Sequence, residues 1–402
     1  MTSLMVSSVQ SFISRRTICW NGYTRIDSLS RVFGSAGLEE TTEKKRWRMR
    51  MTRINRLLIA LLAVLVLACP VLFALRHAHA QGPAPGSSTS ATSAVPVETS
   101  WVVPDIDKLA DDDWGRTVRY GKDLVAKTAS LIGPEVSDPA HRFAGNNLNC
   151  QSCHLDAGTK EFGLPFVGVY ADFPNYRARS GAVGTVEDRI QGCMVRSMNG
   201  KSLPADSREM TAIVAYLKFL SSGRPVGAPT HGRGPGRMPE LTRAADPVHG
   251  QAVYAQNCAA CHGDQGQGQR TGAVGDAQGY VTPPLWGPDS FNDGAGMTRL
   301  INAANFVHDN MPNGVTWQAP ALTTEDAWDV AAFIDSQPRP HKAKLDRDFP
   351  NRLQKPVDAP YGPYVDGLDP AQHKLGPFQP IRDAIKELAA RTPQAPPRTD
   401  HR

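Results

Sequence analysis

Two short motifs constrain this chain more than any other feature. Both follow the pattern C-x-x-C-H, and they read Cys150-Gln-Ser-Cys153-His154 and Cys258-Ala-Ala-Cys261-His262. With seven cysteines and eleven histidines in 402 residues, chance produces about 0.003 such patterns in the whole chain. The pattern is typical of c-type haem attachment, in which two thiols bind the porphyrin and the histidine binds iron. The sequence therefore predicts two covalently bound haem c groups.

Zinc binding, or a thioredoxin-like redox motif, is the alternative interpretation of these motifs. A structural zinc site closes four ligands around the metal, usually with a second Cys or His pair at short spacing. Neither motif is followed by such a pair. We therefore expect haem at both motifs.

The order of a helix, a haem motif and a closing helix occurs twice in the sequence. This repeat predicts two domains of the same kind. In the first, apolar residues that include Trp114 and Val118 recur at helical spacing before the haem motif, and Asp206 caps a closing helix. In the second, a short helix with Val248 precedes the motif, and Thr323 begins the closing helix. We expect a mainly α fold with two tandem class I-like cytochrome c domains, each with one haem, and an irregular C-terminal tail.

Changes in composition set the expected boundaries. The predicted parts are a leader at 1–80, a flexible tether at 81–100, a catalytic domain at 101–223, a linker at 224–240, an electron-transfer domain at 241–340 and a wrapping tail at 341–402.

The leader has the pattern of an export signal. Basic residues after Met51 precede an apolar run over 57–75, and Ala80 completes an A-x-A cleavage site. We expect translation to start near Met51 and the domains to reach the periplasm. The apolar run is also long enough to span a bilayer, so a membrane-anchored form is the alternative.

The formal net charge of +5 belongs to the leader. From residue 81 onward the chain has 32 basic and 35 acidic residues, a formal charge of −3. The charge therefore gives no reason to expect a nucleic-acid partner.

The second motif needs a further iron ligand, and Met311-Pro312 resembles the Met-Pro step of small cytochromes c. Methionine paired with histidine raises the potential of the iron. Met297 and His308 are competing ligands, whereas no lysine occurs between His262 and Lys342. We expect Met311 to bind the second iron.

The first motif is followed by no Met-Pro step. Between Leu155 and Leu203 the soft ligands are Cys193, Met194 and Met198. Four basic residues crowd the segment: Arg177, Arg179, Arg189 and Arg196. Guanidinium groups favour the thiolate form of a nearby cysteine, which binds iron, and they also bind small oxyanions. The alternatives are ligation by Met198, with the arginines solvated or paired with haem propionates.

Several longer strings carry a resemblance to a known family. They are Phe162-Gly-Leu-Pro165, Arg189-Ile-Gln-Gly-Cys193-Met194, Pro283-Pro-Leu-Trp286, Phe349-Pro-Asn-Arg352 and Pro356-Val-Asp-Ala-Pro-Tyr361-Gly-Pro-Tyr364. Over about residues 105–382 the chain resembles the dihaem thiosulfate dehydrogenases, which join two thiosulfate ions to tetrathionate. The chain differs from some members of this family at one position. Some relatives carry a lysine just before the ligand methionine, and here that position is Asn310.

The resemblance implies specific site residues. His154 and Cys193 are expected to bind the active-site iron, and His262 with Met311 the exit iron. Arg179 and Arg189 match the arginines of the substrate pocket, which makes them, with Cys193, the expected catalytic residues. A soluble cytochrome c or a similar acceptor is the expected electron partner.

Two other functions fit the same motifs. A dihaem electron carrier without substrate chemistry would use Met198 or Met194 on the first iron. A sulfur-oxidation dihaem protein that conjugates thiosulfate to a carrier protein would also use a cysteine ligand. A spectrum of the first haem distinguishes the electron carrier from a thiosulfate dehydrogenase. Tetrathionate formed in the absence of a carrier protein distinguishes the dehydrogenase from the conjugating enzyme.

Overall fold

The structure is a computed structural model that describes residues 99–391. These residues belong to one compact unit, Thr92–Arg402, whereas the unit Met1–Ala91 and the expected leader and signal peptide lie outside the described residues. The described part is rich in helices and has two short two-stranded sheets, which agrees with the predicted mainly α fold. None of the helices within 99–391 is both long and apolar enough to cross a membrane.

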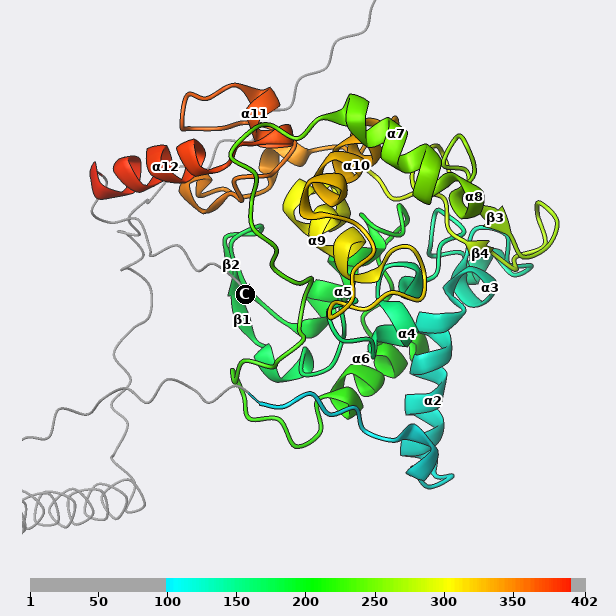
Figure 1. Ribbon diagram of the computed structural model, residues 1–402. Coiled ribbons are helices and arrows are strands. Elements are labelled where there is room, and N and C mark those ends of the chain that lie inside the picture. The colour runs from blue at the N-terminus through cyan, green and yellow to red at the C-terminus, as the bar shows by residue number, and fades with distance from the viewer. Residues whose placement is uncertain (1–98, 392–402) are drawn as a thin grey trace, which may run out of the picture. The chain divides into compact units, whose positions relative to one another are not determined.

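The first domain is built on two long helices that pack against each other, α2 and α6 (Figure 1). A small antiparallel hairpin pairs Tyr176 with Val183. The elements are η1 (Ile106–Lys108), α2 (Asp113–Ala126), α3 (Thr128–Ile132), η2 (Pro139–His141), η3 (Cys150–Ser152), α4 (Leu155–Gly158), η4 (Tyr170–Asp172), β1 (Asn175–Arg177), β2 (Ala182–Gly184), α5 (Val186–Met194) and α6 (Arg208–Leu220).

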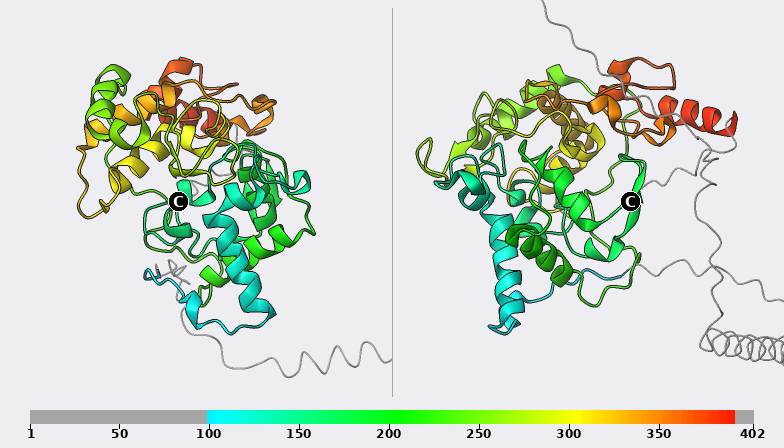
Figure 2. Two further views of the ribbon diagram at one scale, coloured as in Figure 1. Left: turned by 90° about the vertical axis from the view of Figure 1, so that its right-hand side faces the viewer. Right: turned by 180° about the vertical axis from the view of Figure 1, so that it is seen from behind.

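The second domain repeats this plan, with α10 packed on both α7 and α9 (Figures 1 and 2). Its elements are α7 (Pro247–Asn257), α8 (Ala259–His262), β3 (Gln269–Arg270), β4 (Tyr280–Thr282), η5 (Gly296–Thr298), α9 (Leu300–Asn310) and α10 (Thr324–Ser336). The tail adds η6 (Leu345–Arg347), η7 (Arg352–Gln354), α11 (Pro370–Leu375) and α12 (Gln379–Arg391).

A glycine in each domain lets the first helix approach the closing helix. A Cβ atom on Gly121 would collide with the carbonyl oxygen of Ala212, and one on Gly250 with that of Asp329. Both glycines therefore bring two backbones closer than any side chain permits. The repeated order seen in the sequence thus corresponds to a repeated helix crossing.

The predicted cap of the first closing helix was wrong. Ser207, not Asp206, caps α6, because its side chain accepts a hydrogen bond from the backbone N–H of Met210. Trp114 and Val248 lie in the predicted helices, but their side chains are 41% and 80% exposed. The Trp114 ring meets α6 only through Lys218, whose Nζ lies 5.6 Å from the ring centre. By contrast, Thr323 caps α10 as predicted.

The tail packs on both domains. Phe378, Ile381 and Ile385 lie in one buried cluster with Trp328 of α10. On the first domain, the hydroxyl of Tyr176 in β1 donates to Oε1 of Gln354 at 2.7 Å. The tail therefore connects the hairpin of the first domain with the helices of the second.

Replacing Asp329 is expected to destabilise the second domain. Its carboxylate is 1% exposed and accepts bonds from both Nη atoms of Arg243 at 2.8 and 2.9 Å and from the N–H of Asp246 at 2.8 Å. Burial alone would raise the pKa of Asp329, but these bonds and His249 outweigh it and hold the pKa below its usual value. Asp329→Ala should lower the free energy of unfolding by roughly 2–3 kcal/mol at pH 7.

This stabilisation is complete above the carboxyl pKa of the unfolded chain, about 4, and disappears as the pH falls through the lower folded-state pKa. Denaturant unfolding at several pH values should therefore show the variant and the natural protein converging in acid. Glu325→Ala, an exposed change in the same helix, is the control and should change stability by less than about 0.5 kcal/mol. A difference that does not depend on pH would contradict the expectation.

Candidate active site

The first haem motif presents a histidine that is already oriented. Nδ1 of His154 lies 2.5 Å from the carbonyl oxygen of Leu164, and the ring lies 4.2 Å from that of Phe166. Burial lowers the pKa of His154 to about 4, so the imidazole is neutral at pH 7. A neutral ring whose Nδ1–H is held by a carbonyl leaves Nε2 available for a metal.

The second motif has the same arrangement. Nδ1 of His262 lies 2.9 Å from the carbonyl oxygen of Pro283, and burial lowers the pKa of this ring too. Cys150, Cys153, Cys258 and Cys261 are all free thiols. Two free thiols beside an oriented, neutral imidazole are the donors that haem c requires, so both motifs fit the group.

Cys193 lies close to the first motif. It lies half-buried in the last turn of α5. It is close enough to Cys150 and Cys153 to contribute to the raised pKa of both thiols. Its two competitors, Met194 and Met198, are 2% and 3% exposed and lie in the hydrophobic core against which Cys150 also packs. The fold thus brings Cys193 to the motif cysteines, and of the three sulfur side chains it is the one that can form a thiolate.

Met311 directly follows α9, and it packs on the same cluster of side chains as Cys258. Met297 packs instead on a cluster of the first domain and on one that the second domain shares with the tail. His308 lies beside Asp309, with Nδ1 and Oδ1 2.8 Å apart. Of these three side chains, Met311 is therefore the one that shares a cluster with a cysteine of the second motif.

The loops beside the two motifs contact each other. Nδ2 of Asn310 donates to the carbonyl oxygen of Phe162 at 3.2 Å, and Nζ of Lys160 donates to that of Val315 at 3.2 Å. Asn310 is fully buried, whereas a lysine there would need a partner for its charge. The residue before Met311 thus joins the two domains.

The four arginines separate into two pairs. Arg177 and Arg189 form no salt bridge with a described residue. Burial and, after it, the charge of Arg189 lower the pKa of Arg177 to about 10, while Cys193 and Asp188 act in the opposite direction. Arg189 is exposed, and its charge contributes to the lowered pKa of His154. This pair therefore places beside Cys193 positive charge that no salt bridge within residues 99–391 neutralises.

Arg179 and Arg196 share one carboxylate of the tail. Nη1 of Arg179 lies 2.7 Å from Oδ2 of Asp348, and Nη2 of Arg196 lies 2.8 Å from Oδ1. The hydroxyl of Tyr361 completes this group. Sequence reasoning assigned no role to Asp348 or Tyr361, although Tyr361 belongs to one of the strings that carry the family resemblance.

Comparisons with known proteins identify both domains. Residues 141–226 match the SoxA/TsdA cytochrome c domain and residues 247–338 match cytochrome c. The chain is 41% identical over 252 residues to the thiosulfate dehydrogenase of Allochromatium vinosum, covering 61% of this chain and 86% of that one. With the thiosulfate dehydrogenase of Thiomonas intermedia the identity is 38% over 261 residues, covering 65% and 78%.

Among solved structures, thiosulfate dehydrogenase TsdBA from Marichromatium purpuratum is similar, with a TM-score of 0.54 and 34% identity. That match covers 61% of this chain and half of the other, longer chain. Two cytochrome c domains imply two covalently bound haem c groups, as the sequence predicted. Since the identity extends over most of the length of such relatives, the chain belongs to the thiosulfate dehydrogenase family.

Proposed function

We propose that this enzyme oxidises thiosulfate by coupling two ions to one tetrathionate, with release of two electrons. The observation that carries the proposal is Cys193 beside the first haem motif, next to Arg177 and Arg189, whose guanidinium groups form no salt bridge within residues 99–391. The relatives named above support the choice of thiosulfate as the substrate. Haem, when bound, accepts electrons one at a time and passes them on.

Positive charge is needed because two dianions must approach each other. We assign Arg179 and Arg189 to hold the substrate, as predicted from the sequence, and add Arg177. Guanidinium groups fixed before the anions arrive offset the repulsion between them without reorganising. Arg189, which is exposed, meets incoming thiosulfate first, whereas Arg177 is half-buried and its charge interacts with the Cys193 thiol.

Cys193 has two roles in this proposal, as an iron ligand and as a nucleophile. Its sulfur bonds to the terminal sulfur of one thiosulfate, and two electrons leave the pair. The terminal sulfur of a second thiosulfate then attacks the thiosulfate-derived sulfur bound to Cys193. The bond to Cys193 breaks, tetrathionate leaves and the thiolate is restored.

The second domain is proposed as the exit for electrons. A thiolate ligand from Cys193 lowers the potential of its iron, whereas a thioether from Met311 raises it. Electrons therefore pass from the first domain to the second and then to a soluble cytochrome c or a similar acceptor. The export pattern of the leader supports a periplasmic location.

The proposal is tested by the product. Purified enzyme with ferricyanide and no carrier protein should consume two thiosulfates for each tetrathionate, measured by ion chromatography. Thiosulfate consumed only when a carrier protein is added would indicate the conjugating enzyme instead. No consumption, with both haems reducible, would indicate a simple electron carrier.

A further inference from the structure

Asp348 joins three segments that are far apart in the sequence. Its carboxylate, 10% exposed, binds Arg179 and Arg196 of the first domain with one oxygen each. The Nη1 atoms of both arginines also approach the carbonyl oxygen of Gly294 in the second domain, at 3.4 and 3.5 Å. A Cβ atom on Gly294 would lie 2.8 Å from Nη1 of Arg196, so a side chain there would displace the guanidinium group.

Tyr361 closes the same cluster. Its hydroxyl accepts from Nη1 of Arg179 at 2.7 Å and donates to Oδ2 of Asp348 at 2.8 Å. Burial raises the pKa of Tyr361 to about 12, so the hydroxyl keeps its proton at neutral pH and can donate and accept at once. Arg179, Asp348 and Tyr361 thus form a closed triangle of hydrogen bonds.

The tail that supplies these residues is itself fixed on both sides. The backbone N–H of Phe349 donates to the carbonyl oxygen of Arg179 at 2.8 Å, and the Phe349 ring lies 5.0 Å below the guanidinium carbon. Further along, the fully buried Asp358 accepts from Nε of Arg299 at 2.8 Å and from the N–H of Ile301 at 3.1 Å. Asp348 and Tyr361 therefore cannot move independently of the two domains.

These contacts occupy only one end of the Arg179 guanidinium. All of its bonds to described residues use Nη1, which leaves the edge formed by Nε and Nη2 without a partner among residues 99–391. That edge carries two parallel N–H groups, which match an oxyanion bidentately. A fixed Nη1 end with a free second edge is the arrangement expected of a preorganised anion binder.

We infer that Asp348 and Tyr361 of the tail are positioning residues of the thiosulfate site, and that they act by fixing the free edge of Arg179 toward the substrate. The inference rests on the proposed function, because it assumes that Arg179 binds thiosulfate. It assigns to the C-terminal tail a part in substrate binding that the two haem domains alone do not supply.

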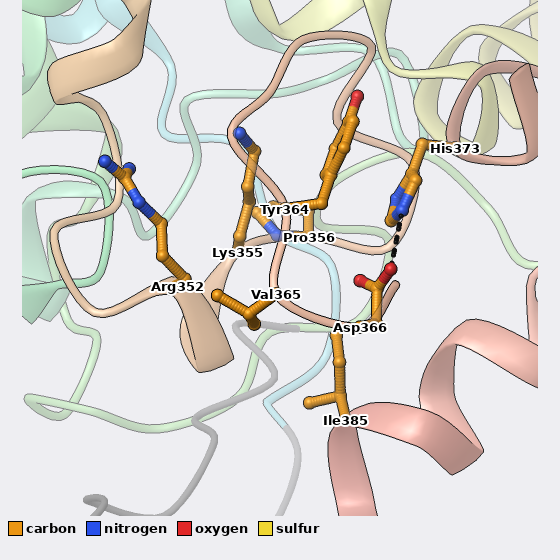
Figure 3. Close-up of a pocket in the computed structure, with 8 residues that line it drawn as sticks. All are labelled: Arg352, Lys355, Pro356, Tyr364, Val365, Asp366, His373 and Ile385. Atoms are coloured by element: carbon orange, nitrogen blue, oxygen red, sulfur yellow. Dashed lines mark hydrogen bonds and ion pairs between the residues drawn. The ribbon is translucent and has the colours of Figure 1, made fainter. Parts of the chain in front are cut away.

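Tyr364 offers a matched control in the same segment. Figure 3 shows it beside Lys355 and His373 in the hollow of the tail. The Nζ atom of Lys355 lies 4.9 Å from the ring centre of Tyr361 and 4.8 Å from that of Tyr364, so both tyrosines border one buried ammonium group. The Tyr364 hydroxyl, however, donates only to the carbonyl oxygen of Ala359 at 2.8 Å.

The test compares Tyr361→Phe with Tyr364→Phe in the full-length holoenzyme. Removing the hydroxyl that orients Arg179 should raise KM for thiosulfate about tenfold and change kcat less than about twofold, while Tyr364→Phe changes neither. Asp348→Asn removes the charge of the other residue that holds Nη1 of Arg179. It should raise KM for thiosulfate at least as much as Tyr361→Phe does. Reduction of the haems by ascorbate, which needs no thiosulfate site, should be unchanged in all three variants.

Each outcome has one interpretation. Equal KM values for the two tyrosine variants, with normal turnover in the natural enzyme, would overturn the positioning role. Parallel losses in kcat, thermal stability and ascorbate reduction would overturn it too, since they would show a structural role only. An absence of thiosulfate turnover in the natural enzyme would instead disprove the proposed function.

Discussion

Cys193→Ala is expected to lower kcat for thiosulfate-dependent reduction of ferricyanide by at least about a thousandfold. Alanine has no sulfur with which to form the covalent adduct and no atom to bind iron. The neighbouring Met194 and Met198 cannot replace the nucleophile, because a thioether has no thiolate form. The spectrum of the first haem should change in the same variant, while that of the second stays as it was.

The matched control for this experiment is Met198→Leu, which replaces the other sulfur of the segment by a side chain of similar volume. The change should leave turnover within about twofold and cost less than about 1.5 kcal/mol of stability. Both haems must first be shown to be attached in each variant. Undiminished turnover in Cys193→Ala, or a loss that occurs only in Met198→Leu, would contradict the assignment of Cys193.

Arg189→Gln is expected to lower kcat/KM for thiosulfate by about a hundredfold, because a charged donor facing two dianions is lost. The fold should not suffer, since the side chain is exposed and forms no salt bridge with a described residue. Steady-state kinetics at several ionic strengths measure the effect. Since the interaction is between exposed charges, the difference between the variant and the natural enzyme should narrow as salt is added.

Arg189→Lys separates charge from geometry. Lysine keeps the positive charge but loses the planar fork that binds an oxyanion with two parallel bonds. We expect it to restore part of kcat/KM and the whole of the salt dependence. Equal activity of the glutamine and lysine variants would show that charge at this position is unimportant, and unchanged activity in both would remove Arg189 from the site.

Some parts of the site are readable in the sequence because they are contiguous. A haem motif places two thiols and a histidine within five residues, and attachment to one porphyrin requires no other segment. The caps of helices are likewise local, which is why Thr323 was recognised. Where the sequence failed, a neighbouring residue made the better contact: Ser207 reaches the N–H of Met210, and Asp206 does not.

The arginines show the limit of such reading. The sequence alone shows four of them near Cys193, without separating those that are paired from those that are free. Arg179 lies 169 residues from Asp348 and 182 from Tyr361 along the chain, and no periodicity connects them. Only the packing of the tail on the hairpin decides that Arg179 is anchored by Asp348, whereas Arg177 and Arg189 form no salt bridge within residues 99–391.

By itself, therefore, the sequence determined two haem c groups and a mainly α pair of cytochrome c domains, and it indicated Cys193 as a candidate ligand. These depend on short covalent patterns and on helical periodicity, which act over a few residues. The tertiary structure alone brought Cys193 to the motif cysteines and separated the arginines that share Asp348 from those that form no salt bridge within residues 99–391. Those features depend on burial and on contacts with distant segments of the chain. The contacts of Arg179 and Arg196 require the tail to be packed on the first domain.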